Sequence, residues 1–211
     1  MIVQGSPEWF AVRSGKVTAS RVADVVARTK SGYSAGRANY AAQLVAERLT
    51  GRTEPGFSNA AMQWGTDNEP AAREAYEYRS GVFVEQIAFV DHPRIVMTGA
   101  SPDGLVGADG MLEVKCPNTA THIETLLSGK IPGKYQTQMA WQMACTGRDW
   151  CDFVSFDPRL PDRMSLFVQR YERDGGFIVE LEREVTLFLA EVEATVAALT
   201  EAYPEPVAEA A

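Results

Sequence analysis

The sequence is poor in the residues that cross-link a chain or anchor it in a membrane. Its three cysteines, Cys116, Cys145 and Cys151, form no Cys-x-x-Cys pair, and only two histidines accompany them. A structural zinc site is therefore not expected, and we interpret the cysteines as reduced, mostly buried thiols. No apolar run approaches the roughly 18 residues of a membrane-spanning helix. Residues 1–9 also lack the pattern of a secretory signal, so we expect a cytoplasmic protein.

Length and composition indicate one globular domain. The 211 residues are 45% hydrophobic and 23% charged, which is ordinary for a folded protein and excludes general disorder. We expect a single domain over residues 1–203. Residues 204–211, which include Pro204 and Pro206, would form a short C-terminal tail.

Charge is unevenly distributed along the chain, whose net charge is −8. Residues 1–52 hold eight Lys/Arg against three Asp/Glu, whereas residues 171–211 hold two against ten. Taken alone, this distribution favours an unevenly charged solvated surface. It also allows a basic N-terminal quarter that lines a nucleic-acid path, with an acidic C-terminal helix turned away from that path.

The hydrophobic periodicity predicts an α/β fold. Helices are predicted over residues 20–27, 38–49, 68–78, 121–127, 134–144 and 176–202. Thr18 and Asn68 are the expected caps of the first and third helices, which places Pro70 in a first turn. Strands are predicted over residues 82–84, 87–90, 95–98, 111–116, 152–156 and 165–171, and residues 30–36 as a flexible loop. Together they predict a small mixed sheet flanked by helices.

Two carboxylates and a lysine are expected to meet at one end of this sheet. Nine residues separate Asp103 from Glu113, which begins the run Glu113-Val114-Lys115. Strand alternation places Glu113 and Lys115 on one face and Val114 on the other. A turn at residues 109–110 would return Asp103 beside them.

This set suits metal-assisted hydrolysis of a phosphodiester. Asp103 and Glu113 are hard oxygen ligands of the kind that Mg²⁺ prefers, and the Val114 carbonyl is a third candidate. The spacing alone favours an ordinary exposed Glu/Lys pair after a turn. The flanking sequence reverses this preference, because Glu113 and Lys115 share a face without another polar partner in the strand. Such burial is costly unless the charges are paired or bound to a metal.

The surrounding run, SPDGLVGADGMLEVKCP (101–117), resembles the active-site signature of the lambda-exonuclease, or YqaJ-type, viral recombinase family. That family has a restriction-endonuclease-like fold. Four further segments resemble family blocks in the same order: WFAVRSGKVTASRVADVV (9–26), MQWGTDNEPAAREAYEYRSG (62–81), YQTQMAWQMACTG (135–147) and DFVSFDPR (152–159).

The resemblance implies catalytic roles for several residues. Asp103 and Glu113 would ligate a metal together with the Val114 carbonyl, and Lys115 would position the attacking water. Glu69 would bind a second metal or its water, and Gln138 would lie near the reacting phosphate. From the residues alone, Glu69 is equally a favourable acid in the first turn of a helix.

The resemblance also implies how the substrate is held. Arg13 and Ser20, joined by Ser101, would grip a 5′-terminal phosphate, and Tyr135 would lie beside Gln138. The sequence leaves simpler interpretations open. Ser20 would be a helix-cap hydroxyl, and Tyr135 with Gln138 would form a half-buried helix face.

The implied activity is that of an alkaline-exonuclease type deoxyribonuclease that uses Mg²⁺, with two ions expected and Mn²⁺ able to substitute. It would degrade one strand of linear duplex DNA from 5′ to 3′ and leave 3′ overhangs for phage-type recombination. A homotrimeric ring and a single-strand annealing protein are the implied partners, in a bacterial or phage-infected cell. The alternatives are an endonuclease or single-strand nuclease of the same fold, and a non-catalytic DNA-binding accessory protein. Clustered carboxylates disfavour the last, because they repel phosphate.

Overall fold

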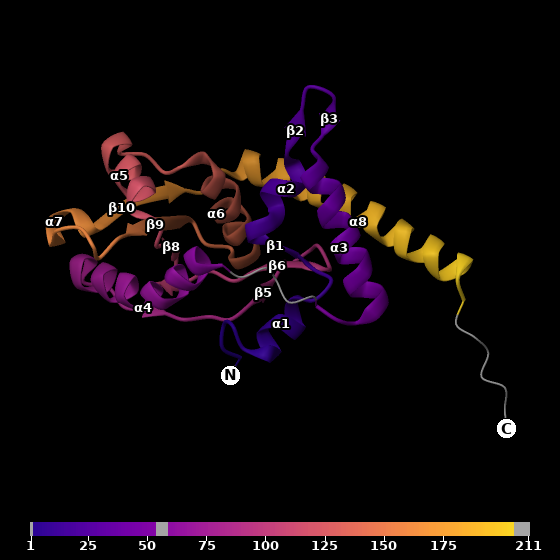
Figure 1. Ribbon diagram of the computed structural model, residues 1–211, viewed down its shortest axis with the longest axis horizontal. Coiled ribbons are helices and arrows are strands. Elements are labelled where there is room, and N and C mark those ends of the chain that lie inside the picture. The colour runs from indigo at the N-terminus through magenta and orange to yellow at the C-terminus, as the bar shows by residue number, and fades with distance from the viewer. Residues whose placement is uncertain (1, 54–58, 205–211) are drawn as a thin grey trace.

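The structure is a computed structural model that describes residues 2–53 and 59–204 (Figure 1). Apart from Pro204, the expected C-terminal tail lies outside the described residues. The helical elements are α1 (Pro7–Arg13), the 3-10 turn η1 (Ala19–Arg21), α2 (Val22–Val26), α3 (Ala35–Thr50), α4 (Ala60–Ser80), α5 (Thr119–Ser128), α6 (Gly133–Thr146), α7 (Asp162–Ser165) and α8 (Gly175–Ala202). The strands are β1 (Val17–Thr18), β2 (Arg28–Thr29), β3 (Gly32–Tyr33), β4 (Val84–Glu85), β5 (Val90–Asp91), β6 (Thr98–Ala100), β7 (Gly104–Val106), β8 (Gly110–Lys115), β9 (Trp150–Phe156) and β10 (Leu166–Glu172).

The main sheet has five strands in the order β10-β9-β8-β7-β4. The central pair β8 and β9 is parallel, and the other pairs are antiparallel. Strands β7 and β8 form a hairpin in which Gly104 lies opposite Leu112. The predicted mixed sheet is therefore confirmed, and the turn before Gly110 returns the chain as expected.

Helices cover both faces of this sheet. Alternate side chains of β8 and β9 pack against α4 on one face, in a cluster that contains Ala72, Tyr76, Leu112, Val114, Cys116, Val154 and Phe156. The other face packs against α6 and α8, in a larger cluster that includes Met111, Cys151, Phe153, Met139, Met143, Ile178 and Leu181. The alternation predicted for residues 113–115 is thus present, and it places Glu113 on the α6 side.

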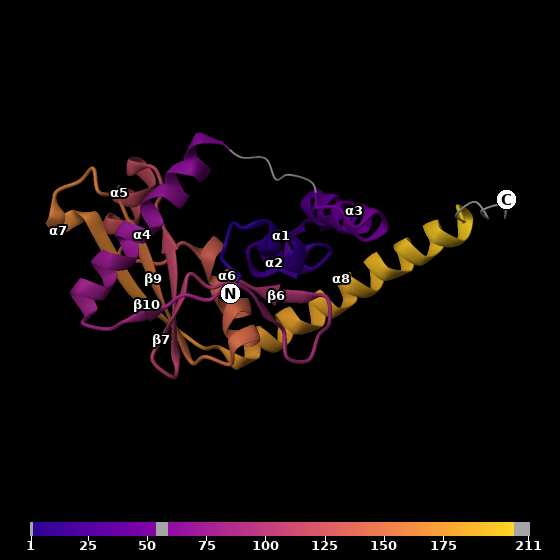
Figure 2. The same cartoon turned by 90° about the horizontal axis from the view of Figure 1, so that it is seen from below.

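A second sheet, β1-β6-β5, joins the N-terminal helices to this core. Helices α2 and α3 pack on α8, and α8 continues past them so that its C-terminal end extends away from the rest of the molecule (Figure 2). The cysteines are free thiols and buried, as expected. Among the described residues, no helix is long and apolar enough to cross a membrane.

Helix α4 begins earlier than the sequence predicted. Asn59 is its cap, with a side chain that accepts a hydrogen bond from the Met62 amide at 2.9 Å. Asn68 lies inside the helix, where its side chain donates to the Trp64 carbonyl. Pro70 is also internal, so the expected first turn is wrong. The helix continues through Pro70 because packing of its apolar face against the sheet outweighs the lost backbone hydrogen bond.

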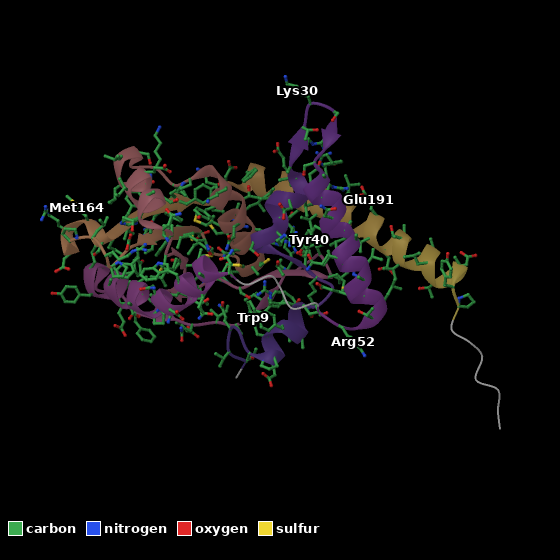
Figure 3. All side chains as sticks on the ribbon, in the orientation of Figure 1. Trp9, Lys30, Tyr40, Arg52, Met164 and Glu191 are labelled. Carbon is green, nitrogen blue, oxygen red and sulfur yellow. The ribbon has the colours of Figure 1, made fainter. Side chains whose placement is uncertain are left out.

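The segment after residue 17 also differs from its prediction. Residues 19–26 form a 3-10 turn followed by a short helix, and the Thr18 side chain makes no capping hydrogen bond. The expected loop at 30–36 instead contains the end of a two-stranded hairpin, β2–β3, and the start of α3. In Figure 3 this hairpin projects from the body with Lys30 near its tip.

Candidate active site

A cavity of about 630 Å³ lies where α1, η1, α4 and α6 meet the carboxyl end of β8. It collects nine of the ten site residues predicted from sequence: Arg13, Ser20, Glu69, Ser101, Asp103, Val114, Lys115, Tyr135 and Gln138. The tenth, Glu113, is fully buried beside them. Residues separated by more than a hundred positions therefore line one cavity.

Asp103 is positioned by the β7–β8 hairpin. One of its carboxylate oxygens, Oδ2, accepts a hydrogen bond from the Val114 amide at 2.6 Å. Its other oxygen, Oδ1, accepts none from the described residues. Gly104, the next residue, permits a close approach of strands, because a Cβ there would lie 2.1 Å from the Val84 side chain. The hairpin thus holds Asp103 beside β8 with one oxygen free.

Glu113 is held by three donors. Gln138 Nε2 lies 2.6 Å from its Oε1, and Gln142 Nε2 lies 2.6 Å from its Oε2. The Lys115 ammonium also pairs with Oε1. Gln142 was not singled out from sequence, although its spacing of four residues from Gln138 puts both amides on one face of a helix.

The charges in this group strongly influence one another. Burial, reinforced by the negative charge of Glu113, raises the pKa of Asp103 well above its ordinary value. Burial alone would lower the pKa of Lys115, but the charges of Glu113 and Asp103 outweigh it and raise that pKa. Lys115 is therefore a permanent cation at neutral pH, suited to orienting water or stabilising phosphate charge rather than accepting a proton.

Glu69 reaches the cavity from the middle of α4. Its Oε1 accepts a hydrogen bond from Arg73 at 2.8 Å, one turn further along the helix. Because α4 begins at Ala60, the interpretation of Glu69 as a first-turn acid is wrong. Glu69 is instead a third carboxylate of this group, and its negative charge helps to raise the pKa of Asp103.

Arg13 also lines the cavity. Its guanidinium lies 3.6 Å from the centre of the Trp9 ring, and the Trp9 indole donates to Ser101 Oγ at 2.9 Å. Burial lowers the pKa of Arg13 to about 10, so it stays charged at neutral pH. Within the described residues it forms no ion pair. Ser20 lines the same cavity and is exposed.

The backbone near Arg13 is less available than its sequence suggests. Gly15 has a φ of 69°, a conformation that glycine adopts readily and that can let backbone approach a ligand closely. Its amide already donates to Glu47 Oε2 at 2.7 Å, and its carbonyl accepts from Arg48. Anion binding at this corner therefore depends on side chains.

Tyr135 forms the wall next to Lys115. Its ring stacks on Phe153 with centroids 5.4 Å apart. The Lys115 ammonium lies 5.5 Å from the ring centroid, and that of Lys134 lies 4.8 Å from it. Tyr135 and Gln138 are indeed on a half-buried helix face, and that face borders the cavity.

The basic N-terminal quarter does not form one free surface. Three of its arginines pair with acidic residues of α8: Arg28 with Glu184, Arg37 with Glu191 and Arg48 with Glu193. Lys16 and Arg21 pair with aspartates elsewhere. The acidic helix α8 therefore lies against these basic residues. Among the described residues, Arg13 is the member of this group that lines the cavity without an ion pair.

The donor set fits a hard divalent cation. Asp103 presents a free oxygen, and Glu113 lies beside it with its Oε1 contacted by two cavity-lining side chains. No group of three or more His, Cys, Asp or Glu side chains arranged to hold a metal occurs in residues 2–53 and 59–204. Mg²⁺ tolerates this, because it usually keeps several waters and binds through one or two carboxylates. A cation here would also relieve the repulsion between Asp103 and Glu113.

Solved structures of nucleases resemble this one closely. The alkaline exonuclease LHK-Exo from Laribacter hongkongensis is 55% identical, with a TM-score of 0.88, over 93% of this chain and 97% of that one. LHK-Exo in complex with dAMP matches over the same shares at 56% identity and a TM-score of 0.88. A phage-related exonuclease from Haemophilus somnus 129PT has the same fold, with a TM-score of 0.68 at 14% identity, over 92% of this chain and 99% of that one. A comparison with curated proteins gives no match.

The fold, with its close match to LHK-Exo, defines an enzyme of the alkaline exonuclease class. The model of the YqaJ-like viral recombinase domain matches residues 8–149, and the chain belongs to that family. The resemblance inferred from the sequence motifs is thereby confirmed.

Proposed function

We propose that the protein is a divalent-metal-dependent exonuclease that degrades one strand of linear duplex DNA from its 5′ end and leaves 3′ overhangs for recombination. The observation that carries this proposal is the cavity itself. It combines the Asp103, Glu113 and Lys115 cluster with Arg13, which is charged and forms no ion pair among the described residues. The 55% sequence identity to an alkaline exonuclease supports the proposal.

The chemistry follows from the positions of the side chains. Asp103 and Glu113, with the Val114 carbonyl, would hold Mg²⁺ or Mn²⁺, and Glu69 would take part in a second ion site. A bound ion of this kind polarises the phosphate and lowers the pKa of a bound water. Lys115 stays protonated, so its role is to orient the attacking water and stabilise charge on the phosphate. Gln138 holds Glu113 and faces the same space.

The 5′ end would be recognised by Arg13, Ser20 and Ser101, which line the same cavity. Arg13 offers a planar set of donors that suits a terminal phosphate. Ser20 and Ser101 add hydroxyls, although Ser101 already accepts from Trp9. Tyr135, which lines the cavity beside Lys115 and Lys134, would also contact the substrate.

We further propose that the chain works as a homotrimer in the cytoplasm of a bacterial or phage-infected cell, with a single-strand annealing protein as partner. Light scattering at working concentration tests the assembly. A monomer that remains fully processive would contradict the ring.

The activity is tested by digesting three substrates with Mg²⁺: linear duplex with 5′-phosphate ends, linear duplex with 5′-hydroxyl ends, and a covalently closed circle. We expect rapid loss of the first, slow loss of the second and none of the third. Release of a 5′-terminal label as mononucleotide sets the polarity, and EDTA should stop the reaction. Nicking of the circle would favour an endonuclease, and binding without cleavage would favour an accessory protein.

A further inference from the structure

Gln142 is buried outside the cavity lining but hydrogen-bonds to Glu113, one of the proposed metal ligands. It lies on α6 one turn after Gln138, and its Nε2 donates to Glu113 Oε2 at 2.6 Å. Unlike Gln138, which lines the cavity, Gln142 has no exposed surface. It therefore cannot contact DNA, and any role it has in the reaction acts through Glu113.

The donors divide the two oxygens of Glu113 between two environments. Gln138 and Lys115, both cavity-lining, contact Oε1. Gln142, from the interior of α6, is the donor to Oε2 among the described residues. Oε1 is therefore the oxygen at the cavity, and Oε2 points into the protein.

The Gln142 amide also leaves its own oxygen unsatisfied. Its Oε1 is buried without a hydrogen-bond partner in the described structure. Buried polar atoms of this kind are uncommon, and an apolar side chain of similar size would avoid one. Turning the amide would place its oxygen against Glu113 Oε2, so the hydrogen bond to the carboxylate fixes its orientation.

We propose that Gln142 is a positioning residue that holds Glu113 so that Oε1 alone faces the metal, making Glu113 a monodentate ligand. The proposal rests on the proposed metal-dependent function. Removing a residue that hydrogen-bonds to a metal ligand and orients it typically lowers metal affinity or activity by about 10- to 100-fold.

The test is a calorimetric titration of the DNA-free protein with Mn²⁺. Gln142→Met keeps the volume and removes the donor, and we expect about 10- to 100-fold weaker binding. The kcat on linear duplex should fall with it while KM for DNA stays unchanged. Met143→Leu is the matched control, because Met143 is the adjacent residue, equally buried and within the core. It should bind Mn²⁺ like the wild type.

A second variant keeps the test decisive. Gln142→Asn retains the amide but shortens it by one methylene, so it should also lose the contact and the affinity. If Gln142→Met does not fold, Gln142→Asn carries the measurement. Wild-type affinity in a folded variant would overturn the proposal, as would a wild type that binds no Mn²⁺. Wild-type Mn²⁺ binding without DNA degradation would instead defeat the proposed function and leave the positioning role intact.

Discussion

Two regions of this molecule use similar charged side chains in opposite ways. On the face that α8 covers, charges are paired, as in the contact of Arg37 with Glu191. In the cavity at the end of β8, Asp103 lies against Glu113, and Arg13 has no carboxylate partner in the described structure. Paired charges hold elements together, whereas unbalanced ones are costly and can be offset by a ligand. The difference supports the cavity as the candidate active site.

The contrast appears within a single stretch of basic sequence. Arg13 and Arg37 are both largely buried and both stack on aromatic rings: Arg13 on Trp9, and Arg37 on Tyr33 at 4.0 Å. Burial lowers the pKa of Arg13, while the hydrogen bonds to Glu191 raise that of Arg37. The same residue type thus forms an ion pair with α8 in one region and lines the cavity as a candidate binding group in the other.

The largest expected effect comes from the carboxylates. Asp103→Ala and Glu113→Ala should each abolish cleavage, with a loss of at least about a thousandfold, since the bound metal contributes several kcal/mol to the transition state. The loss of cleavage is measured as the rate of digestion of 5′-phosphorylated linear duplex. Circular dichroism checks that each variant is folded. Asp109→Ala is the control, because Asp109 lies in the same hairpin outside the cavity lining. Retained cleavage in either variant would remove that residue from the site.

The next effect separates the two arginines. Arg13→Ala should slow digestion of 5′-phosphate ends relative to 5′-hydroxyl ends by roughly 10- to 100-fold, as expected for loss of a charge-assisted contact. Arg13→Lys should restore little, because an ammonium lacks the planar donor set. Arg37→Ala should leave the ratio of the two rates unchanged. If Arg13→Ala keeps the wild-type ratio, end recognition lies elsewhere.

Arg37 should instead matter for stability. Its side chain is 8% exposed and makes hydrogen bonds of 2.5 and 2.9 Å to Glu191. Arg37→Ala should lower the free energy of unfolding by about 1–3 kcal/mol, because it removes a charged hydrogen-bonded pair between α3 and α8. Denaturant unfolding measures the loss. Arg52→Ala, at an exposed position after α3, should change it little, and equal losses in both would contradict the assigned role.

The smallest effect is a pH dependence on the α8 side. His92 Nδ1 accepts hydrogen bonds from the Arg94 and Ile95 amides, and its Nε2 lies 3.2 Å from Glu182. Burial lowers the pKa of His92, although Glu182 opposes this shift. The unfolded chain therefore binds the proton more readily. Stability is retained above about pH 6.5 and falls below it, by at most about 1.4 kcal/mol per pH unit.

His92→Asn isolates this effect, because Asn supplies an acceptor that does not titrate. The unfolding free energy of this variant should fall less than that of the wild type between pH 7 and pH 5, a range chosen roughly to span the ordinary histidine pKa. Identical pH profiles would show that other groups dominate.

Much of the candidate site could be predicted from sequence, because local rules bring its residues together. Strand alternation sets the faces of residues 113–115, and the short β7–β8 hairpin returns Asp103 to them. Blocks of family sequence then identified the more distant members, such as Arg13 and Glu69. The helices whose apolar pattern was regular, including α6 and α8, were placed within a few residues.

Other features depended on contacts that no local pattern specifies. The sequence suggested that α4 begins after a cap at Asn68, yet the helix packs against the sheet and begins at Ala60. Gln142 donates its hydrogen bond to Glu113, on a strand 29 residues earlier in the chain.

By itself, then, the sequence determined the family, the mixed α/β core and the carboxylates and lysine of the site, because short-range geometry and motif chemistry specify them. Only the tertiary structure decided which charges are free. Eight basic residues in the first quarter of the chain look alike in sequence, but α8 returns from the far end of the chain and pairs with three of them. Whether a buried charge binds a ligand or a neighbour depends on what lies within a few ångströms, and distant segments meet there only after the chain has folded.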